Sequence, residues 1–584
     1  MRKSYHLFLG LLFCMSAHAY DFESGGIYYD ITSSTTVSVT NNEDMEQTYS
    51  GEVVIPETVN HGNNSYTVTA VGKAFIGCSA LTSVTLPNSI TSIGDFAFAS
   101  SGLSSISIPD NVASIGFSAF ENSSIHSIVI PDNVKNIGDR AFCSCSWLTS
   151  VTLPNSITSI GYGVFSGCHL LTSLTIPYSV TSIGESAFSG CTQLVSLSIP
   201  DNVESIGDYA FQSCQNLSSI TFGNGVTYIG KNAFYGCYKL TSVVIPENVT
   251  SLGGSAFESC INLESVMLSH HITVIKPWTF RGCDRLESVF IPKSVIDISP
   301  DAFDCPLTVS DENPRYAAAE GVLFNKDFSE LIRYPKKKTE PDYTIPNSVV
   351  VIKPRAFEYC KNLKSITIPD CVTSIEEEAF YDSGLTSIVI PESITELKYA
   401  VFGECYSLQS VTIPNSVTHI GEGVFAMCDN LTSIMIPASV TSIAVGAFYK
   451  CNSLADIYLL NTVPVSISDD MFTSDIYSNT RLHVPQGKAT DYRNADGWKN
   501  FVNIVDDAVS SLNFSYHITD AKIFANGDNV IIENARVGEP VLVYDESGKL
   551  IKTAQIVDKR LEMQLPINRI YIIKCANKVE KIRL

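Results

Sequence analysis

The chain has 584 residues, more than one hydrophobic core usually serves, so its length predicts either several domains or an open-ended array of repeats. Hydrophobic residues make up 45% and charged residues 17%, a balance that excludes a disordered chain. The formal net charge of −22 repels phosphate backbones and anionic lipid, which argues against nucleic acid or a membrane surface as a main partner.

Residues 1–19 have the pattern of a secretory signal peptide. Two basic residues precede the apolar run 7–15, and a small-x-small sequence ends at Ala19. We expect cleavage after Ala19; lipid attachment at Cys14 is the alternative, which the bulky phenylalanine before it disfavours. No later stretch has about eighteen uninterrupted apolar residues, so we expect no transmembrane segment in the exported chain.

A unit of about 23 residues repeats through the predicted domain 66–506. The strings that begin at Leu81, Leu148 and Leu431 are near copies. Each unit reads L-x-S-V/I-x-I-P, a short turn, V/I-T-S-I-G, and then A-F-x-x-C. A unit this short cannot bury its own Leu, Ile and Phe, but stacked units align them in continuous apolar columns. The sequence therefore predicts a mainly β solenoid with one short strand and several tight turns in each coil.

Phenylalanine and cysteine each recur once per unit. We assign the phenylalanines to the core spine. Stacked strands lie about 4.8 Å apart, and parallel side chains keep Cβ atoms equally far apart, beyond the roughly 3.5–4.5 Å of a disulfide. We therefore expect a column of buried free thiols, with metal ligation as the weaker alternative. Three units are one residue short and lack the cysteine, as if that residue only filled a turn. The cysteine column is 78, 145, 168, 191, 214, 237, 260, 283, 360, 405, 428 and 451.

The register breaks once, over residues 304–345. The apolar runs 321–324 and 330–335 flank an Asn-Lys-Asp turn and predict an inserted β-hairpin. It is either a tolerated insertion or a feature that contacts a ligand, and both readings stay open. From residue 507 to residue 584 alternating apolar and polar residues replace the repeat, which predicts a small antiparallel β-sandwich.

The unit IPNSVTSIGxxAFxxCxxLTSVTIP resembles the BspA-like class of leucine-rich repeats. The resemblance implies a leucine-rich-repeat solenoid, an N-terminal β-cap over 20–65 and a closing segment from RLHVPQGK to NIVD. The C-terminal strings VLVYDESGKLIKT and IYIIKCANKVEKIRL resemble the sorting domains of type IX secretion in Gram-negative bacteria, although Asn568 and Arg569 stand where those domains usually have glycine. Together these resemblances imply a protein secreted or held at the outer cell surface.

One strand position is left free to vary. In L-x-S-V-x-I-P the V and I point inward, so the x between them points outward. It is Thr or Ser in many units, but three consecutive units carry Val244, Met267 and Phe290, and two later ones carry Met435 and Tyr458. Large side chains exposed together mark a binding surface, so we predict these five as partner-binding residues. The alternative is that the hairpin covers the first three, or that they merely suit a strand.

No pattern of an enzyme is present. HExxH and GxSxG are absent, and His270-His271 replace the Asn, Asp or Ser of other turns, which favours a turn substitution over a metal site. We expect no catalysis and no metal or organic cofactor. The favoured function is adhesin-like binding of host or bacterial surface proteins, host matrix proteins included, which the family resemblance implies. Recognition of surface glycans is an alternative, although the chain has only 3 tryptophans. A structural envelope component without a specific ligand is another.

Overall fold

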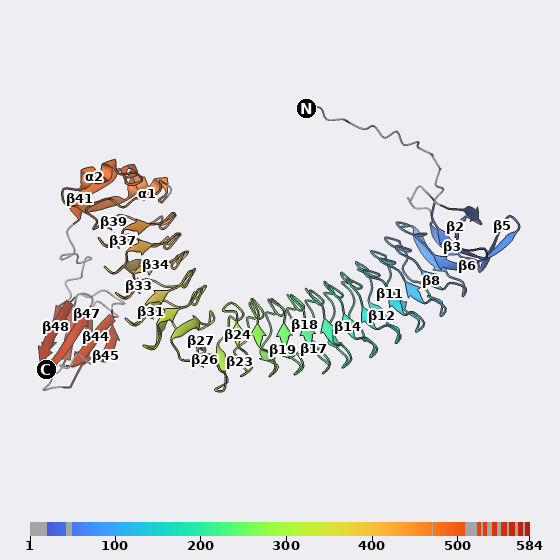
Figure 1. Ribbon diagram of the computed structural model, residues 1–584, viewed down its shortest axis with the longest axis horizontal. Helices are drawn as coiled ribbons and strands as arrows, with labels where there is room; N and C mark the ends of the chain where they lie inside the picture. The colour runs from blue at the N-terminus through green and yellow to red at the C-terminus, as the bar shows by residue number, and fades with distance from the viewer. Residues whose placement is uncertain are drawn as a thin grey trace, which may run out of the picture.

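Stacked β-coils form a curved row along most of the chain (Figure 1). The computed structural model describes residues 20–42, 49–469, 471–508, 522–526, 529–533, 540–545, 550–556, 560–566, 570–575 and 578–583. The predicted signal peptide and the lipidation alternative at Cys14 lie outside these residues. Within the described part of the chain, no helix is long and apolar enough to cross a membrane.

The N-terminal strands lead directly into the solenoid. β1, β2 and β3 pair antiparallel, β5 and β6 form a hairpin, and β3 pairs with β6 in parallel. β6 then pairs in parallel with the first short strand of the coils, so the sheet continues without a break. The strands are β1 (Phe22–Ser24), β2 (Ile27–Ile31), β3 (Thr36–Thr40), β4 (Gly51–Val54), β5 (Thr58–His61) and β6 (Asn64–Val71).

Most coils contain two short strands, one more than the sequence predicted. The longer strand lies at L-x-S-V-x-I-P and pairs in parallel with its equivalent, as Ser196 does with Ser219. The longer strands are β7 (Leu81–Thr85), β10 (Ser127–Val129), β12 (Ser150–Thr152), β15 (Ser196–Ser198), β17 (Ser219–Thr221), β19 (Ser242–Val244), β21 (Ser265–Met267), β23 (Val289–Ile291), β25 (Leu307–Val309), β29 (Asp342–Thr344), β31 (Ser365–Thr367), β33 (Ser387–Val389), β35 (Ser410–Thr412), β37 (Ser433–Ile436) and β39 (Asp456–Leu459). The predicted solenoid of stacked coils about 23 residues apart is confirmed.

The second strand of each coil has two residues and lies at the T-S-I-G element. These strands form continuous parallel sheets, the longest running from β13 to β24. They are β8 (Ser92–Ile93), β9 (Ser114–Ile115), β11 (Asn136–Ile137), β13 (Ser159–Ile160), β14 (Ser182–Ile183), β16 (Ser205–Ile206), β18 (Tyr228–Ile229), β20 (Ser251–Leu252), β22 (Val274–Ile275), β24 (Asp297–Ile298), β30 (Val351–Ile352), β32 (Ser374–Ile375), β34 (Glu396–Leu397), β36 (His419–Ile420) and β38 (Ser442–Ile443).

The phenylalanine column is the spine of the core, as predicted. Phe211 and its neighbours in the column are buried, and their rings stack nearly parallel. Ring centroids of consecutive members lie between 4.9 Å, for Phe357 and Phe380, and 5.7 Å, for Phe448 and Phe472. Each ring therefore contacts the coil before it and the coil after it, which makes stability a nearest-neighbour property.

The cysteine column consists of free thiols, as predicted. None of the 16 described cysteines is part of a disulfide, and 15 of them are buried. The Cys214 thiol donates a hydrogen bond to the carbonyl of Phe188 in the preceding coil, at 3.2 Å, and the Cys168 thiol makes the equivalent bond to Phe142 at 3.1 Å. Burial raises the pKa of Cys214 to about 12. The thiol is thus a hydrogen-bond donor between coils.

The cysteine position is therefore more than a turn filler, which corrects our expectation. In the three short units a buried serine takes that position: Ser101, Ser123 and Ser383. The Ser123 hydroxyl lies 3.4 Å from the Cys145 thiol of the next coil. The short units have one residue instead of two between this serine and the next leucine or isoleucine. In the first of these units that residue is Gly102. A Cβ atom at Gly102 would lie 2.1 Å from the carbonyl oxygen of Ser79, so this turn requires glycine, whereas the second short unit has Ser124 at the equivalent position.

Residues 304–345 hold three antiparallel strands where the sequence suggested one hairpin. β26 (Tyr316–Ala319) pairs with β27 (Val322–Asn325), and β27 pairs with β28 (Glu330–Arg333). β28 also pairs in parallel with β30, so it belongs to the solenoid itself. The Tyr334 ring lies 5.2 Å from that of Phe357 and takes the place of a column phenylalanine.

The insertion joins two apolar cores. Leu323 packs in the core that contains the coils before the insertion, whereas its neighbours Val322 and Phe324 pack in the core after it. Lys336, part of a run of three lysines, is half-buried with its ammonium 2.9 Å from Asp304. β27 is thus an integral part of the core packing. Lys336 is already paired with Asp304 and is not available to an external anion.

The solenoid ends in a mixed segment, and two antiparallel sheets follow. The mixed segment comprises α1 (Ser474–Asn479), β40 (Arg481–Pro485), α2 (Ala489–Asn494), η1 (Trp498–Asn500) and β41 (Asn503–Ala508). One sheet contains β42 (Lys522–Asn526), β43 (Asn529–Glu533) and β46 (Arg560–Gln564), and the other β44 (Pro540–Asp545), β45 (Leu550–Gln555), β47 (Ile570–Cys575) and β48 (Lys578–Arg583). Val530 and Val541 share one apolar cluster between the sheets. The role of these two sheets in type IX sorting stays a prediction.

Candidate functional site

The outward positions of the longer strands form a continuous surface, here called the strand face. Val244, Met267 and Phe290 lie on it with 60%, 60% and 53% of their surface exposed. Their neighbours Val243 and Val289 are buried, so the alternation of inward and outward side chains is as predicted. Val244 and Met267 are direct partners across β19 and β21. We call Val244, Met267 and Phe290 the apolar stripe.

The inserted strands do not cover the apolar stripe. Phe290 of β23 is paired with Thr308 of β25, the last strand before the inserted strands, and its side chain is still more than half exposed. The three side chains therefore offer one solvent-facing apolar surface along consecutive rungs. Isolated exposed apolar residues are ordinary on protein surfaces, whereas adjoining large ones are a mark of binding.

Charged side chains border the stripe at both ends of its strands. Glu264 and Glu287 precede the rungs of Met267 and Phe290, and both are exposed. Arg285 lies 3.4 Å from Glu264, and Lys293 lies 2.9 Å from Glu312. Arg285 and Lys293 are thus already paired within the chain.

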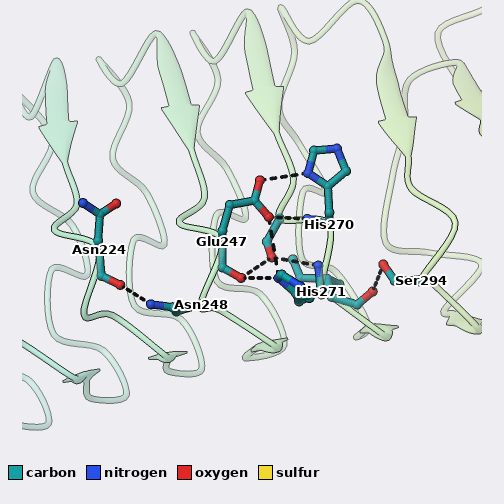
Figure 2. Close-up of polar contacts among 8 residues, drawn as sticks. Asn224, Glu247, Asn248, His270, His271 and Ser294 are labelled. Atoms are coloured by element: carbon teal, nitrogen blue, oxygen red, sulfur yellow. Dashed lines mark hydrogen bonds and ion pairs between the residues drawn. The ribbon is translucent and has the colours of Figure 1, made fainter.

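Figure 2 shows the turn that follows Met267 and β21, where Glu247 faces His270 and His271. The His270 Nδ1 atom lies 2.8 Å from a carboxylate oxygen of Glu247, and His271 Nδ1 lies 2.8 Å from the Glu247 backbone carbonyl. The hydrogen bond from His270 lowers the pKa of Glu247. Both histidines close a turn against the preceding coil. Among the residues that the structure describes, no group of three His, Cys, Asp or Glu side chains is placed to hold a metal.

The side chains of Met435 and Tyr458 are less exposed than those of the apolar stripe. Met435 and Tyr458 are partners across β37 and β39, but both are only half-exposed. The Tyr458 ring stacks on His483 of β40, with centroids 4.3 Å apart. The pair lies several rungs beyond the insertion, so the structure does not bring it together with the apolar stripe. It is a smaller surface of its own.

His483 holds the end of the solenoid together and was not foreseen. Its Nε2 atom lies 2.9 Å from Asp456 and its Nδ1 atom 2.7 Å from Asp507. Burial alone would raise the pKa of Asp456, but hydrogen bonds from His483 and Arg481 lower it. The imidazole of β40 thus joins Asp456 of β39 to Asp507 of β41. The sequence does not show this contact, because it depends on the parallel pairing of β40 with β39 and β41.

A second feature of the strand face also escaped the sequence reasoning. An open hollow of about 400 Å³ crosses the rungs that precede the apolar stripe. Its lining is Ser150, Val151, Ser173, Leu174, Thr175, Ser196, Leu197, Ser198, Ser219 and Thr221. We call it the hydroxyl hollow. The signal in the sequence was the near absence of charge in these four strand segments, where Asp201 is the one charged residue.

Comparison with known proteins identifies the repeat. The model of the BspA type leucine rich repeat region, with 6 copies, matches residues 71–195, 181–307 and 337–485. No curated protein matches the chain. Among solved structures, a leucine rich cell surface protein from Faecalibacterium prausnitzii A2-165 is 29% identical, with 75% of this chain and 94% of that chain covered and a TM-score of 0.32. A leucine-rich repeat protein from Bacteroides ovatus ATCC 8483 is 25% identical, with 72% and 95% covered and a TM-score of 0.37.

Proposed function

Because this chain belongs to the BspA-type leucine-rich repeat family, we propose that it is a secreted or cell-surface protein of a Gram-negative bacterium that binds host or bacterial surface proteins. The observation that carries the proposal is the apolar stripe, in which Val244, Met267 and Phe290 are all more than half exposed on consecutive rungs. The signal-peptide pattern of residues 1–19 supports the location. The proposed role is adhesin-like and involves no catalytic step.

The apolar stripe alone would bind weakly. Covering three side chains of this size contributes on the order of 5 kcal/mol, and association costs roughly 4–15 kcal/mol in lost freedom of motion. Useful affinity therefore needs further contacts beside the stripe, or many copies on one cell that engage a surface together. Glu287, exposed at the start of the Phe290 rung, is a charged group beside the stripe that can add such a contact.

Removal of the apolar stripe tests the proposal. The double substitution Met267→Ser and Phe290→Thr, in the chain from residue 20 onward, should abolish capture of a surface protein from extracts of bacterial or host cells. A matched control is Val129→Thr with Val389→Thr, because those valines are 66% and 65% exposed on the same strand face but have no large apolar neighbour. Equal capture by the wild type and the stripe variant would refute the proposal.

A further inference from the structure

The hydroxyl hollow is an uncharged surface on a strongly acidic chain. Four rungs cross it, each running from a leucine to the turn residue after the proline position. Over these four segments Asp201 is the one side chain with a formal charge, in a chain whose net charge is −22. The Asp201 carboxylate accepts a hydrogen bond from the Asn224 backbone amide at 2.7 Å, so it is already engaged. The segments are 148–155, 171–178, 194–201 and 217–224.

The hollow has a dense set of available hydrogen-bonding groups. Ser150, Ser173, Ser196 and Ser219 stand one per rung, all exposed, and a hydroxyl both donates and accepts. Over the described coils these four hydroxyls form no hydrogen bond within the chain, whereas Thr221 donates to Ser198 at 3.1 Å. The hollow thus presents rows of free hydroxyls along the solenoid axis.

The middle rung also leaves its backbone open. β12 pairs with β10, and β15 pairs with β17. Ser173–Thr175, on the rung between β12 and β15, is part of no strand. In the described coils around it, no backbone hydrogen bond joins Ser173–Thr175 to either neighbouring rung. Its amide and carbonyl groups are therefore not engaged in a ladder to the neighbouring rungs, so they add to the hydrogen-bonding groups at the hollow.

Aromatic rings stand at both margins. Trp147 is 56% exposed where the chain enters the first rung, and Tyr178 is 63% exposed where the chain leaves the second. The Trp147 ring is stacked on His126 of the preceding coil, with centroids 5.9 Å apart, which holds its plane. An exposed ring offers an apolar platform next to polar groups. The rings and hydroxyls together are the combination that a sugar requires, because it has apolar C–H faces and hydroxyl edges.

We propose that the hydroxyl hollow, flanked by Trp147 and Tyr178, binds a neutral polysaccharide chain lying along the solenoid axis. The absence of charge selects a neutral ligand over an acidic glycan, a nucleic acid or a charged peptide. Successive rungs are about 4.8 Å apart, so four rungs span roughly 14 Å, enough for several sugar units in an extended chain. This site is separate from the apolar stripe and does not depend on a protein partner.

Native gel electrophoresis through soluble neutral polysaccharides tests this site. The probes are a β-glucan, an α-glucan, a mannan and a neutral galactan, with alginate and heparin as charged comparisons. The chain from residue 20 onward should be retarded by at least one neutral polymer and by neither charged one. Trp147→Ala with Tyr178→Ala should reduce that affinity by at least about tenfold, since both aromatic platforms are lost.

Two controls keep the result specific. Tyr238→Ala removes a tyrosine that is 39% exposed outside the hollow, and it should leave retardation unchanged. Thermal unfolding of each variant verifies that the coils remain folded. The proposal is overturned by no retardation in any neutral gel, by equal retardation in charged gels, or by retardation that survives loss of both rings. Loss of retardation in the Met267→Ser and Phe290→Thr variant alone would also overturn it, because binding would then belong to the apolar stripe.

Discussion

The rungs from Ser150 to Thr221 and the rungs from Val244 to Phe290 have the same interior and different exteriors. Inside both, buried phenylalanine rings stack, and buried thiols donate to the carbonyl of the preceding coil at 3.1 to 3.3 Å. Outside, the first set presents hydroxyls without charge and the second presents apolar side chains with charged margins. The comparison teaches that the inward columns fix the coil, while the outward strand position is free to vary from one set of rungs to the next.

The largest expected effect of a single substitution comes from placing a charge in the shared interior. Cys214→Asp should lower the free energy of unfolding of the surrounding coils by more than about 4 kcal/mol, because a carboxylate would be buried against the carbonyl of Phe188. Cys214→Ser is the matched control, since Ser101, Ser123 and Ser383 occupy this position naturally. Thermal and denaturant unfolding followed by circular dichroism measure both. Similar stability of the two variants would mean that the column tolerates charge and is not dry.

A slightly smaller loss is expected when a ring leaves the spine. Phe211→Ala should cost about 3–5 kcal/mol, because a cavity would open between two stacked neighbours whose ring centroids lie 5.2 Å away. Hydrogen exchange should show the loss of protection centred on the coils next to residue 211 and fading with distance, as nearest-neighbour stability requires. A uniform loss over the whole chain would instead indicate a single cooperative unit.

The interior could be predicted from the sequence because each inward position makes the same contact in every coil. The periodic Phe and Cys, read with the spacing of strands, were enough to expect stacked rings and free thiols. The thiol hydrogen bond and its serine substitutes were missed because sequence spacing does not reveal that the side chain at 214 reaches the carbonyl at 188. The roles of Tyr334 and His483 were missed for the same reason, since each depends on one contact that the repeat does not contain.

The exterior was only partly predictable. Alternation along a strand was enough to expect Val244, Met267 and Phe290 to be exposed. It could not reveal that His483 covers Tyr458, because that contact comes from a segment beyond the repeats. Nor could it reveal the hydroxyl hollow, whose lining comes from four successive rungs, one of which, Ser173–Thr175, is part of no strand.

The thiols should also make the shared interior sensitive to alkali. Burial raises the pKa of Cys214, Cys260 and Cys451 from the ordinary 9.0 to about 12. Between these values the unfolded chain loses thiol protons that the folded chain keeps, so stability falls as the pH rises above about 9. The slope should reach about 1.4 kcal/mol per pH unit for each thiol that ionises only on unfolding. Denaturant melts from pH 7 to pH 11 measure it, and a flat profile above pH 9 would contradict the buried-thiol account.

The smallest expected effect on stability comes from substitutions at the exposed strand positions of the first set of rungs. Replacing Thr175, Ser198 and Thr221 by Val, Met and Phe copies the apolar stripe onto the first set of rungs. Each change should alter the free energy of unfolding by no more than about 0.5 kcal/mol, because all three side chains are exposed. Thermal melts give the stability, and capture assays should show a gain of partner binding. A large loss of stability would show that the outward position also holds the fold.

The most direct test of the central claim is where a partner touches the protein. A photo-crosslinking amino acid at position 267, on the strand face, is compared with one at position 228, on the short strand β18, where the tyrosine is 39% exposed. After illumination with intact cells, the account predicts crosslinked surface proteins from position 267 and none above background from position 228. Crosslinks from position 228 alone, or equally from both, would contradict the assignment of binding to the strand face.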